Sequence, residues 1–241
     1  MFKSMTMQFY AGRNKKEGQT AQWLVAAYHT LNDHFGNLHW WPGDSPVEII
    51  VGAILTQNTA WQNVEKAIAN LKQAYMLSTA GMLTIPESDL ATLIRPSGYY
   101  NIKARRLKAF FTFLQEFYNG NLDDMLGEET SALRKQLLQV KGIGEETADS
   151  ILLYAGGKPV FVVDAYTRRV LTRHGIIRDG LAYGEIQLLF MEYLPPDPDL
   201  YNQYHALLVI TGKNYCKKKP RCEECPLNKL DKPQVSDITL Q

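Results

Sequence analysis

The chain has almost no excess of positive charge, because 26 Lys and Arg residues are balanced by 25 Asp and Glu. Its formal net charge at pH 7 is only +1, whereas many proteins that bind polyanions carry a strongly basic surface. Any contact with a polyanion must therefore come from local groups of side chains and backbone donors.

Long apolar runs are also missing. No segment approaches the length of a membrane span, and residues 1–20 are mixed and polar, without the apolar core of a signal peptide. We therefore expect a cytoplasmic protein with no membrane partner. Disulfides are rare in that compartment, and the chain has three Cys, all near the C-terminus, which favours metal ligands over bridges.

Strand alternation does not persist anywhere in the sequence, and the apolar run Val160–Val163 is too short to make a sheet. Apolar residues recur at helical spacing instead, as in 20–35 and 102–117. The 241 residues are enough for one large domain or two small ones with proper cores. The sequence therefore predicts an all-α protein.

The long helix over 102–117 shows an apolar stripe that runs from Ile102 to Phe117. Four cationic residues lie between the apolar positions: Lys103, Arg105, Arg106 and Lys108. The simplest interpretation is that they form a solvated face.

The stretch from Val140 to Asp164 is the most informative part of the sequence. Apolar residues on both sides of Lys141-Gly142-Ile143-Gly144 predict two short helices joined by a hairpin. The glycines can take positive φ and carry no Cβ, so the backbone can approach a ligand closely. The first N–H groups of the second helix lack partners within the helix and favour a phosphate. The plainer alternative is an ordinary turn, with Asp164 as no more than a helix N-cap.

This stretch resembles the helix–hairpin–helix DNA glycosylases of the endonuclease III superfamily. The resemblance implies that the hairpin holds a DNA phosphate and that Asp164 acts at the sugar carbon being cut. Gln57 matches the polar residue that wedges into DNA where a base is extracted, although Gln57 and Asn58 could simply cap helix ends. The DNA-binding residues implied in this way are Gln57, Asn58, Lys141, Gly142, Ile143, Gly144 and Thr147.

The same resemblance implies a domain arrangement. A six-helix barrel with the hairpin would span 46–157, and a second helical domain would combine 1–45 with 158–241. Asp164 and the hairpin would lie at the junction of the two domains. The expected partner is double-stranded DNA with a damaged base, and the expected state is a monomer.

One position departs from the bifunctional members of the superfamily. They place a catalytic Lys two residues after the second hairpin glycine, where this chain has Glu146. A Lys amine can form a Schiff base with the sugar, and a carboxylate cannot. The sequence therefore predicts a monofunctional glycosylase that uses water as the nucleophile.

The segment 216–231 carries all three cysteines, Cys216, Cys222 and Cys225. Thiolates at this spacing favour a soft metal or a cluster, and the segment resembles the 4Fe–4S loop of endonuclease III. The fourth Cys is missing, and Asp231 stands at its spacing. Three interpretations remain open: a cluster held by three Cys and Asp231, a cluster with a labile iron, and a relic loop with free thiols. Zinc bound by the same residues is a further alternative.

Four residues resemble the base pocket of one branch, 3-methyladenine DNA glycosylase III. They are Trp40, Trp41, Pro42 and Trp61. In that branch aromatic side chains clamp a flipped alkylated base, which is cationic and attracted to aromatic faces. The alternatives are a mismatch or uracil-type glycosylase of the same superfamily, and a non-catalytic helix–hairpin–helix DNA-binding protein.

Overall fold

The structure is a computed structural model that describes residues 15–231 of the chain. Within this range it contains helices and no strand, which confirms the predicted all-α class. None of the described helices combines the length and the apolar character needed to cross a membrane. Most of the N-terminal stretch that was predicted to lack a signal sequence, residues 1–14, lies outside the described residues.

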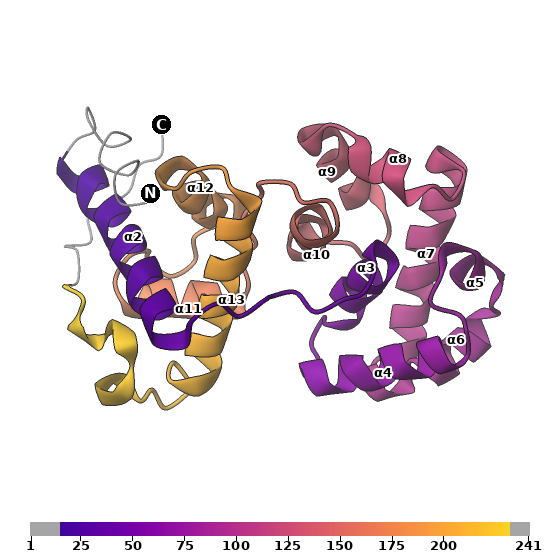
Figure 1. The fold of residues 1–241 in the computed structure, drawn as a ribbon, viewed down its shortest axis with the longest axis horizontal. Coiled ribbons are helices and arrows are strands. Elements are labelled where there is room, and N and C mark those ends of the chain that lie inside the picture. Colours follow the sequence, from indigo (N-terminus) through magenta and orange to yellow (C-terminus); the bar gives the residue numbers. More distant parts are fainter. Residues whose placement is uncertain (1–14, 232–241) are drawn as a thin grey trace. The chain divides into compact units, whose positions relative to one another are not determined.

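The chain forms two compact units. The central unit, Trp41–Lys158, is one continuous segment (Figure 1). Its helices are α3 (Pro46–Leu55), α4 (Trp61–Gln73), α5 (Thr79–Thr84), α6 (Glu87–Leu93), η1 (Arg95–Ser97), α7 (Tyr100–Tyr118), α8 (Leu122–Gly127), α9 (Thr130–Gln139), α10 (Glu145–Ser150) and the π-helical turn η2 (Ile151–Ala155).

The terminal unit joins residues up to Trp40 with residues from Pro159 onward. Its described helices are α2 (Lys15–Phe35), α11 (Ala165–Arg173), α12 (Tyr183–Tyr193), α13 (Pro198–Asn214), η3 (Cys222–Glu224) and η4 (Pro226–Lys229). Segments from both ends of the sequence therefore build this unit together, and α2 packs against α13 (Figure 1).

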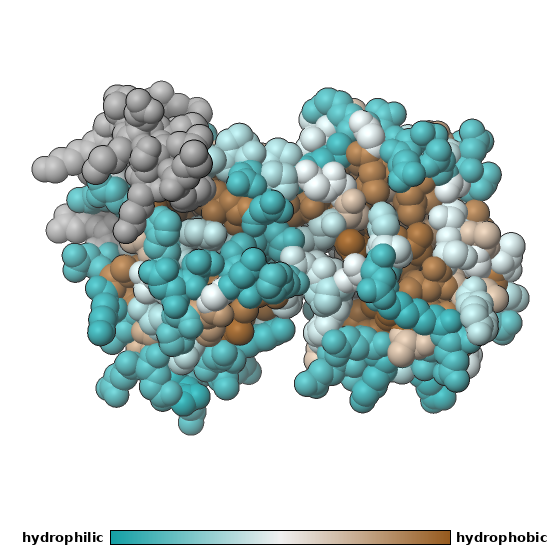
Figure 2. All heavy atoms as spheres, viewed as in Figure 1, coloured by the Kyte–Doolittle hydropathy of each residue, from teal (hydrophilic) through white to brown (hydrophobic). Residues whose placement is uncertain are grey.

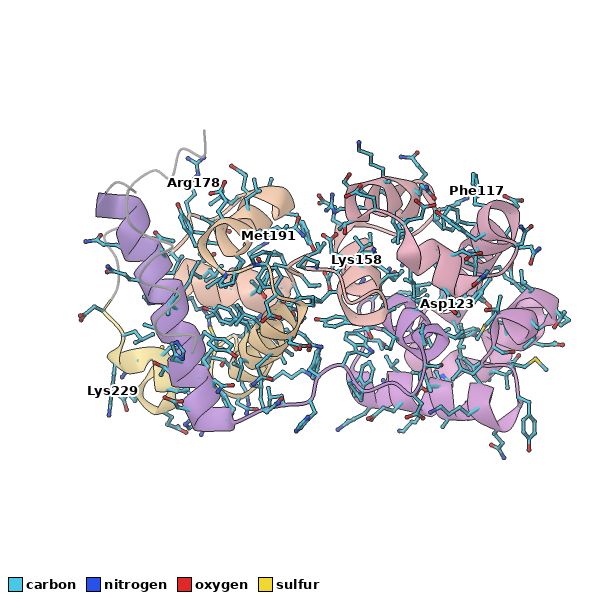
Figure 3. All side chains as sticks on the ribbon, turned by 45° about the horizontal axis from the view of Figure 1, so that its top comes forward. Phe117, Asp123, Lys158, Arg178, Met191 and Lys229 are labelled. Carbon is cyan, nitrogen blue, oxygen red and sulfur yellow. The ribbon has the colours of Figure 1, made fainter. Side chains whose placement is uncertain are left out.

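The core of the central unit is built around α7. Leu107, Phe110, Phe111 and Leu114 lie on one side of this helix and are fully buried. The prediction that the apolar stripe extends to Ile102 and Phe117 was wrong. Ile102 is 43% exposed and Phe117, labelled in Figure 3, is 67% exposed. The buried face of α7 instead ends at Lys103 and Ala104 on one side and at Tyr118 on the other.

The prediction of a solvated cationic face on α7 was also wrong in part. Lys103 is only 1% exposed, and its ammonium donates hydrogen bonds to Leu55 O (2.8 Å) and Ser97 O (2.7 Å). Lys108 Nζ donates to Met82 O (2.8 Å) and Leu83 O (3.0 Å). Carbonyl oxygens left over at the ends of other helices attract these cations, which the sequence of α7 alone does not reveal.

The core of the terminal unit surrounds the segment Val160–Val163. This segment has no regular secondary structure and is buried, and its Phe161 ring stacks on Phe190 with ring centroids 3.6 Å apart. Gln187 Nε2 donates to Phe161 O at 2.7 Å, so α12 satisfies one backbone acceptor of this segment. The short apolar run that could not make a sheet is thus a core segment that ends at Asp164.

The surface of the described chain is mixed. On the face drawn in Figure 2, hydrophilic residues predominate and hydrophobic residues show between them. This pattern is usual for a folded protein and marks no site by itself.

Candidate functional site

The hairpin between α9 and α10 is formed by two glycines with different roles. Gly142 has φ +92°, and a Cβ at this position would overlap the Arg106 side chain. Gly144 has φ −98° and caps the N-terminus of α10, so only Gly142 takes the positive φ that the sequence suggested for both glycines. No described atom lies within 4 Å of the place that a Cβ on Gly144 would occupy.

An ion pair fixes the two helices of the hairpin. Arg134 on α9 donates from Nε to Asp149 Oδ1 (2.7 Å) and from Nη2 to Asp149 Oδ2 (3.0 Å). The Asp149 side chain is fully buried. Removing one partner of such a buried pair typically destabilises a protein by about 3–5 kcal/mol. The pair therefore makes the hairpin geometry rigid.

Gln57 connects the end of α3 to the hairpin. Its Nε2 donates to Thr147 Oγ1 at 2.7 Å and to Gly142 O at 3.3 Å. Thr147, a predicted DNA contact, is 5% exposed and accepts this bond. In the structure Gln57 thus faces the hairpin of its own chain. Asn58 beside it is exposed with φ +52°, a conformation that Asn tolerates better than most residues.

The hairpin presents few side chains to solvent. Lys141 is exposed, whereas Ile143 is 5% exposed and anchors the turn in the core. Glu146 is exposed in the first turn of α10. The position that carries lysine in bifunctional members therefore presents a carboxylate to solvent.

Lys103 lies directly under the end of α3. Burial, with a smaller contribution from the Arg106 charge, lowers its pKa from 10.5 to about 8. Ser97 O, which accepts from Lys103, also accepts from Thr59 Oγ1 at 2.6 Å. The ammonium therefore ties α3, α7 and the η1 turn together beneath Gln57.

Asp164 lies where the buried segment 160–163 meets α11. Its Oδ1 accepts the Thr167 N–H at 2.7 Å, so the residue is the N-cap of α11. Its Oδ2 lies 3.8 Å from His205 Nε2, and the side chain is 12% exposed. The N-cap interpretation is thus correct as geometry, and one carboxylate oxygen remains outside the cap.

The four predicted base-pocket residues fall into both units. Trp41 stacks on Tyr154 with ring centroids 4.8 Å apart and meets Trp61 edge-on at 5.0 Å. Pro42 is exposed beside them. Trp40 belongs to the terminal unit, where Lys213 Nζ lies 5.8 Å from its ring centroid. The structure therefore groups Trp41 with Trp61 and adds Tyr154 to them.

The three cysteines line one cavity of about 80 Å³ in the terminal unit. They lie in the segment 216–231, in which Lys229 is labelled in Figure 3. Arg173 Nη1 lies 3.3 Å from Cys216 Sγ, and burial raises the pKa of the Cys225 thiol. Asp231 is exposed and does not line the cavity. Within residues 15–231 no group of three His, Cys, Asp or Glu side chains is placed to hold a single metal ion. The three thiols are of the donor type that a cluster requires, and no fourth thiol or carboxylate among the described residues lines the cavity with them.

Sequence reasoning missed three of these residues, namely Lys103, Tyr154 and His205. Each lies within a helical pattern and looks like an ordinary core or surface position. Only the folded structure brings Lys103 to the carbonyl groups, Tyr154 to Trp41, and His205 to Asp164.

Comparisons with known proteins agree with this architecture. Residues 51–196 match the HhH-GPD superfamily of base excision DNA repair proteins. The protein MJ1434 of Methanocaldococcus jannaschii, provisionally named a DNA repair glycosylase, is 47% identical over 209 residues, covering 86% of this chain and 94% of that protein. Endonuclease III of Thermotoga maritima is 32% identical over 181 residues, covering 75% of this chain and 79% of that protein.

A solved structure is similar as well. The 3-methyladenine DNA glycosylase MagIII of H. pylori, bound to 1,N6-ethenoadenine, has a TM-score of 0.70 and 30% identity. The match covers 81% of this chain and 97% of that one. The chain belongs to the HhH-GPD superfamily and is a base excision repair DNA glycosylase.

Proposed function

We propose that this superfamily member is a monofunctional glycosylase that hydrolyses the N-glycosidic bond of alkylated purines, such as 3-methyladenine, in duplex DNA. It would act as a monomer. The observation that carries the proposal is the aromatic group of Trp41, Trp61 and Tyr154 in the central unit. The similarity to a 3-methyladenine DNA glycosylase supports the same substrate class.

The chemistry of the substrate explains why aromatic rings suffice. Purines methylated at N3 or N7 carry a positive charge, so their glycosidic bond is already weak and the base leaves as a neutral molecule. No general acid is required. Aromatic faces attract a cation through the ring quadrupole, and this attraction strengthens when water is excluded. The aromatic rings would therefore select the damaged base by its charge.

The reaction also requires a group that stabilises the positive charge on the sugar, and Asp164 would be that group. A carboxylate stabilises the oxocarbenium-like transition state and orients the attacking water. Its Oδ1 is engaged with the Thr167 N–H, whereas Oδ2 lies outside the cap. The cap would hold the carboxylate in place, and Oδ2 would be the oxygen that acts at the sugar.

Glu146 supports the monofunctional assignment. A lysine at this position would form an imine with the sugar and lead to strand cleavage. The exposed Glu146 carboxylate has no nucleophilic amine, so water remains as the nucleophile. The product would be free base and an intact abasic strand.

The hairpin would hold a DNA phosphate. The N–H groups at the start of α10 favour an anion, and the exposed Lys141 adds a cation. Backbone donors position a phosphate without a strongly basic surface, which agrees with the near-neutral charge of the chain. Affinity for duplex DNA should fall as salt is raised.

Cys216, Cys222 and Cys225 would hold a 4Fe–4S cluster, with Asp231 as the fourth ligand. Asp231 would have to turn toward the cavity, because it is exposed in the structure. Such a cluster would stiffen the loop that carries Lys217, Lys218, Lys219 and Arg221 and present these cations to phosphates.

A panel of duplexes tests the function. The duplexes contain 3-methyladenine, 7-methylguanine, uracil opposite guanine, thymine opposite guanine, or an oxidised purine, and free base is measured. We expect release of methylated purine, no nicking without added base or heat, and no adduct on borohydride treatment. Efficient trapping would disprove the monofunctional assignment. Preferential release of uracil or thymine would favour the mismatch alternative.

A further inference from the structure

We infer that His205 is a positioning residue for the reaction: its imidazole holds the Oδ2 side of the Asp164 carboxylate in its working orientation. The inference rests on the proposed role of Asp164. According to this inference, α13 holds the Asp164 oxygen that the N-cap of α11 does not hold.

The two oxygens of Asp164 have different surroundings. Oδ1 is held by the Thr167 N–H at 2.7 Å, while Oδ2 faces His205 Nε2 at 3.8 Å. The second distance is about 0.8–0.9 Å longer than the most common N–H···O hydrogen bond. Catalytic hydrogen bonds are often long before substrate binds and tighten in the complex. A small rotation about the capped carboxylate would bring the two groups into contact.

His205 is held firmly in place. It lies on α13 and is 4% exposed, and its ring meets the Phe161 ring edge-on with centroids 6.5 Å apart. The preceding residue, Tyr204, donates through its hydroxyl to Leu24 O at 2.8 Å. Phe161 itself precedes Asp164 by three residues, in the buried segment 160–163. The same core therefore fixes both the histidine and the carboxylate.

The imidazole is neutral near pH 7. Burial lowers its pKa, the Lys213 charge acts in the same direction, and the Asp164 carboxylate opposes both without reversing the shift. A cationic imidazole would cancel the negative charge that the developing sugar cation needs. A neutral ring with its proton on Nε2 donates to Oδ2 and leaves that charge in place. We assign this tautomer because the other would turn a nitrogen lone pair toward the carboxylate.

Substitutions at His205 test the inference. In His205→Gln the amide nitrogen can reach about as far as Nε2, in His205→Asn it falls short, and in His205→Leu no donor remains. The single-turnover rate constant for base release and the Kd for an abasic-site duplex are measured for each. We expect the Leu and Asn variants to lose rate by about 10- to 100-fold, as for a misplaced reacting group. We expect Gln to recover most of the rate and all three variants to bind abasic duplex within about twofold of wild type.

Tyr204→Phe is the matched control. It removes the hydroxyl bond to Leu24 from the same helix but does not alter the group that faces Asp164. It should lower Tm without changing the rate constant well below Tm. If His205→Leu fails to fold, the Gln and Asn pair decides. Equal rates for that pair, or losses of rate, binding and Tm together, would overturn the positioning role.

Failure of this inference is distinguishable from failure of the proposed substrate. Rates are expressed relative to wild type on whichever duplex wild type cleaves in the panel. If wild type releases no methylated purine, the substrate proposal is wrong, and the His205 variants are still compared on the base that is released. With an active wild type, three results exclude His205 as a positioning residue: a Leu variant as fast as wild type, equal rates for the Gln and Asn variants, or a joint loss of rate, binding and Tm.

Discussion

Replacing Asp164 by Asn separates the charge of this side chain from its role as a helix cap. Asn accepts the Thr167 N–H through its own Oδ1, and Asn and Asp are about equally good N-caps. The lost negative charge at the N-terminus of α11 costs about 0.3–1 kcal/mol. We therefore expect the free energy of unfolding of Asp164→Asn to fall by less than about 1 kcal/mol.

The effect on the reaction should be far larger. Removing one electrostatic stabiliser of a transition state typically lowers the rate by about 10²–10³, which corresponds to about 3–4 kcal/mol of barrier. Single-turnover base release should show this loss, and binding to an abasic-site duplex should be nearly unchanged. Asp164→Ala should lose as much rate and, because the cap is also removed, about 1 kcal/mol more stability.

Asp197 provides the matched control. It caps α13 in the same unit by accepting from the Asp199 N–H at 2.9 Å. Asp197→Asn should show the same small change in stability and a wild-type rate. If Asp164→Asn turns over within about threefold of wild type, the residue is only a cap and the catalytic argument is refuted.

Three further predictions concern other parts of the molecule. Lys103→Met should destabilise the protein, since two ammonium–carbonyl bonds are lost. Folding lowers the pKa of Lys103 from 10.5 to about 8, so between these pH values the unfolded chain binds more protons than the folded chain. The free energy of unfolding of wild type should therefore rise with pH across that window, relative to that of the Met variant. Urea melts of both proteins at pH 7.5 and 10 test this, and a stability difference between wild type and variant that is the same at both pH values would contradict it. Trp61→Ala should raise the barrier to excision of methylated purine by about 1–3 kcal/mol and leave binding to an abasic-site duplex unchanged. An equal loss of excision and of binding, together with a lower Tm, would instead indicate a core role for Trp61. Anaerobically purified protein should be brown with stoichiometric iron and sulfide, and Asp231→Cys should slow iron loss in air; a colourless, fully active protein with three titratable thiols would establish the relic loop.

The sequence predicted the hairpin and the N-cap position of Asp164, because both depend on residues that are close together in the chain. Spacing of apolar residues and two glycines define the turn between α9 and α10, and the N-cap of α11 is set by Asp164 and the N–H three residues later. Such features can be predicted from the sequence because the residues that form them are close together in the chain. The all-α class followed from the same local periodicity.

The rest of the site depends on partners far apart in sequence. His205 is 41 positions from Asp164, and Lys103 is 48 positions from the carbonyl of Leu55. The sequences of α13 and α7 do not indicate that these two residues are buried. In sequence, a buried polar residue looks like an ordinary polar position that interrupts an apolar stripe. Their chemistry arises only when the folded chain brings an anion or a free carbonyl to them.

The two hairpin glycines show how a structure separates requirements of the fold from requirements of a ligand. Gly142 is explained by the chain itself, since φ is +92° and Arg106 occupies the place of a Cβ. Gly144 has an ordinary extended φ of −98°, and no described atom would meet a Cβ there. Glycine in mid-chain has an entropic cost on folding, so a glycine that the fold does not need suggests a constraint from outside. The DNA phosphate that we propose at the first N–H groups of α10 would supply that constraint, because a residue without a Cβ lets a ligand approach the backbone closely.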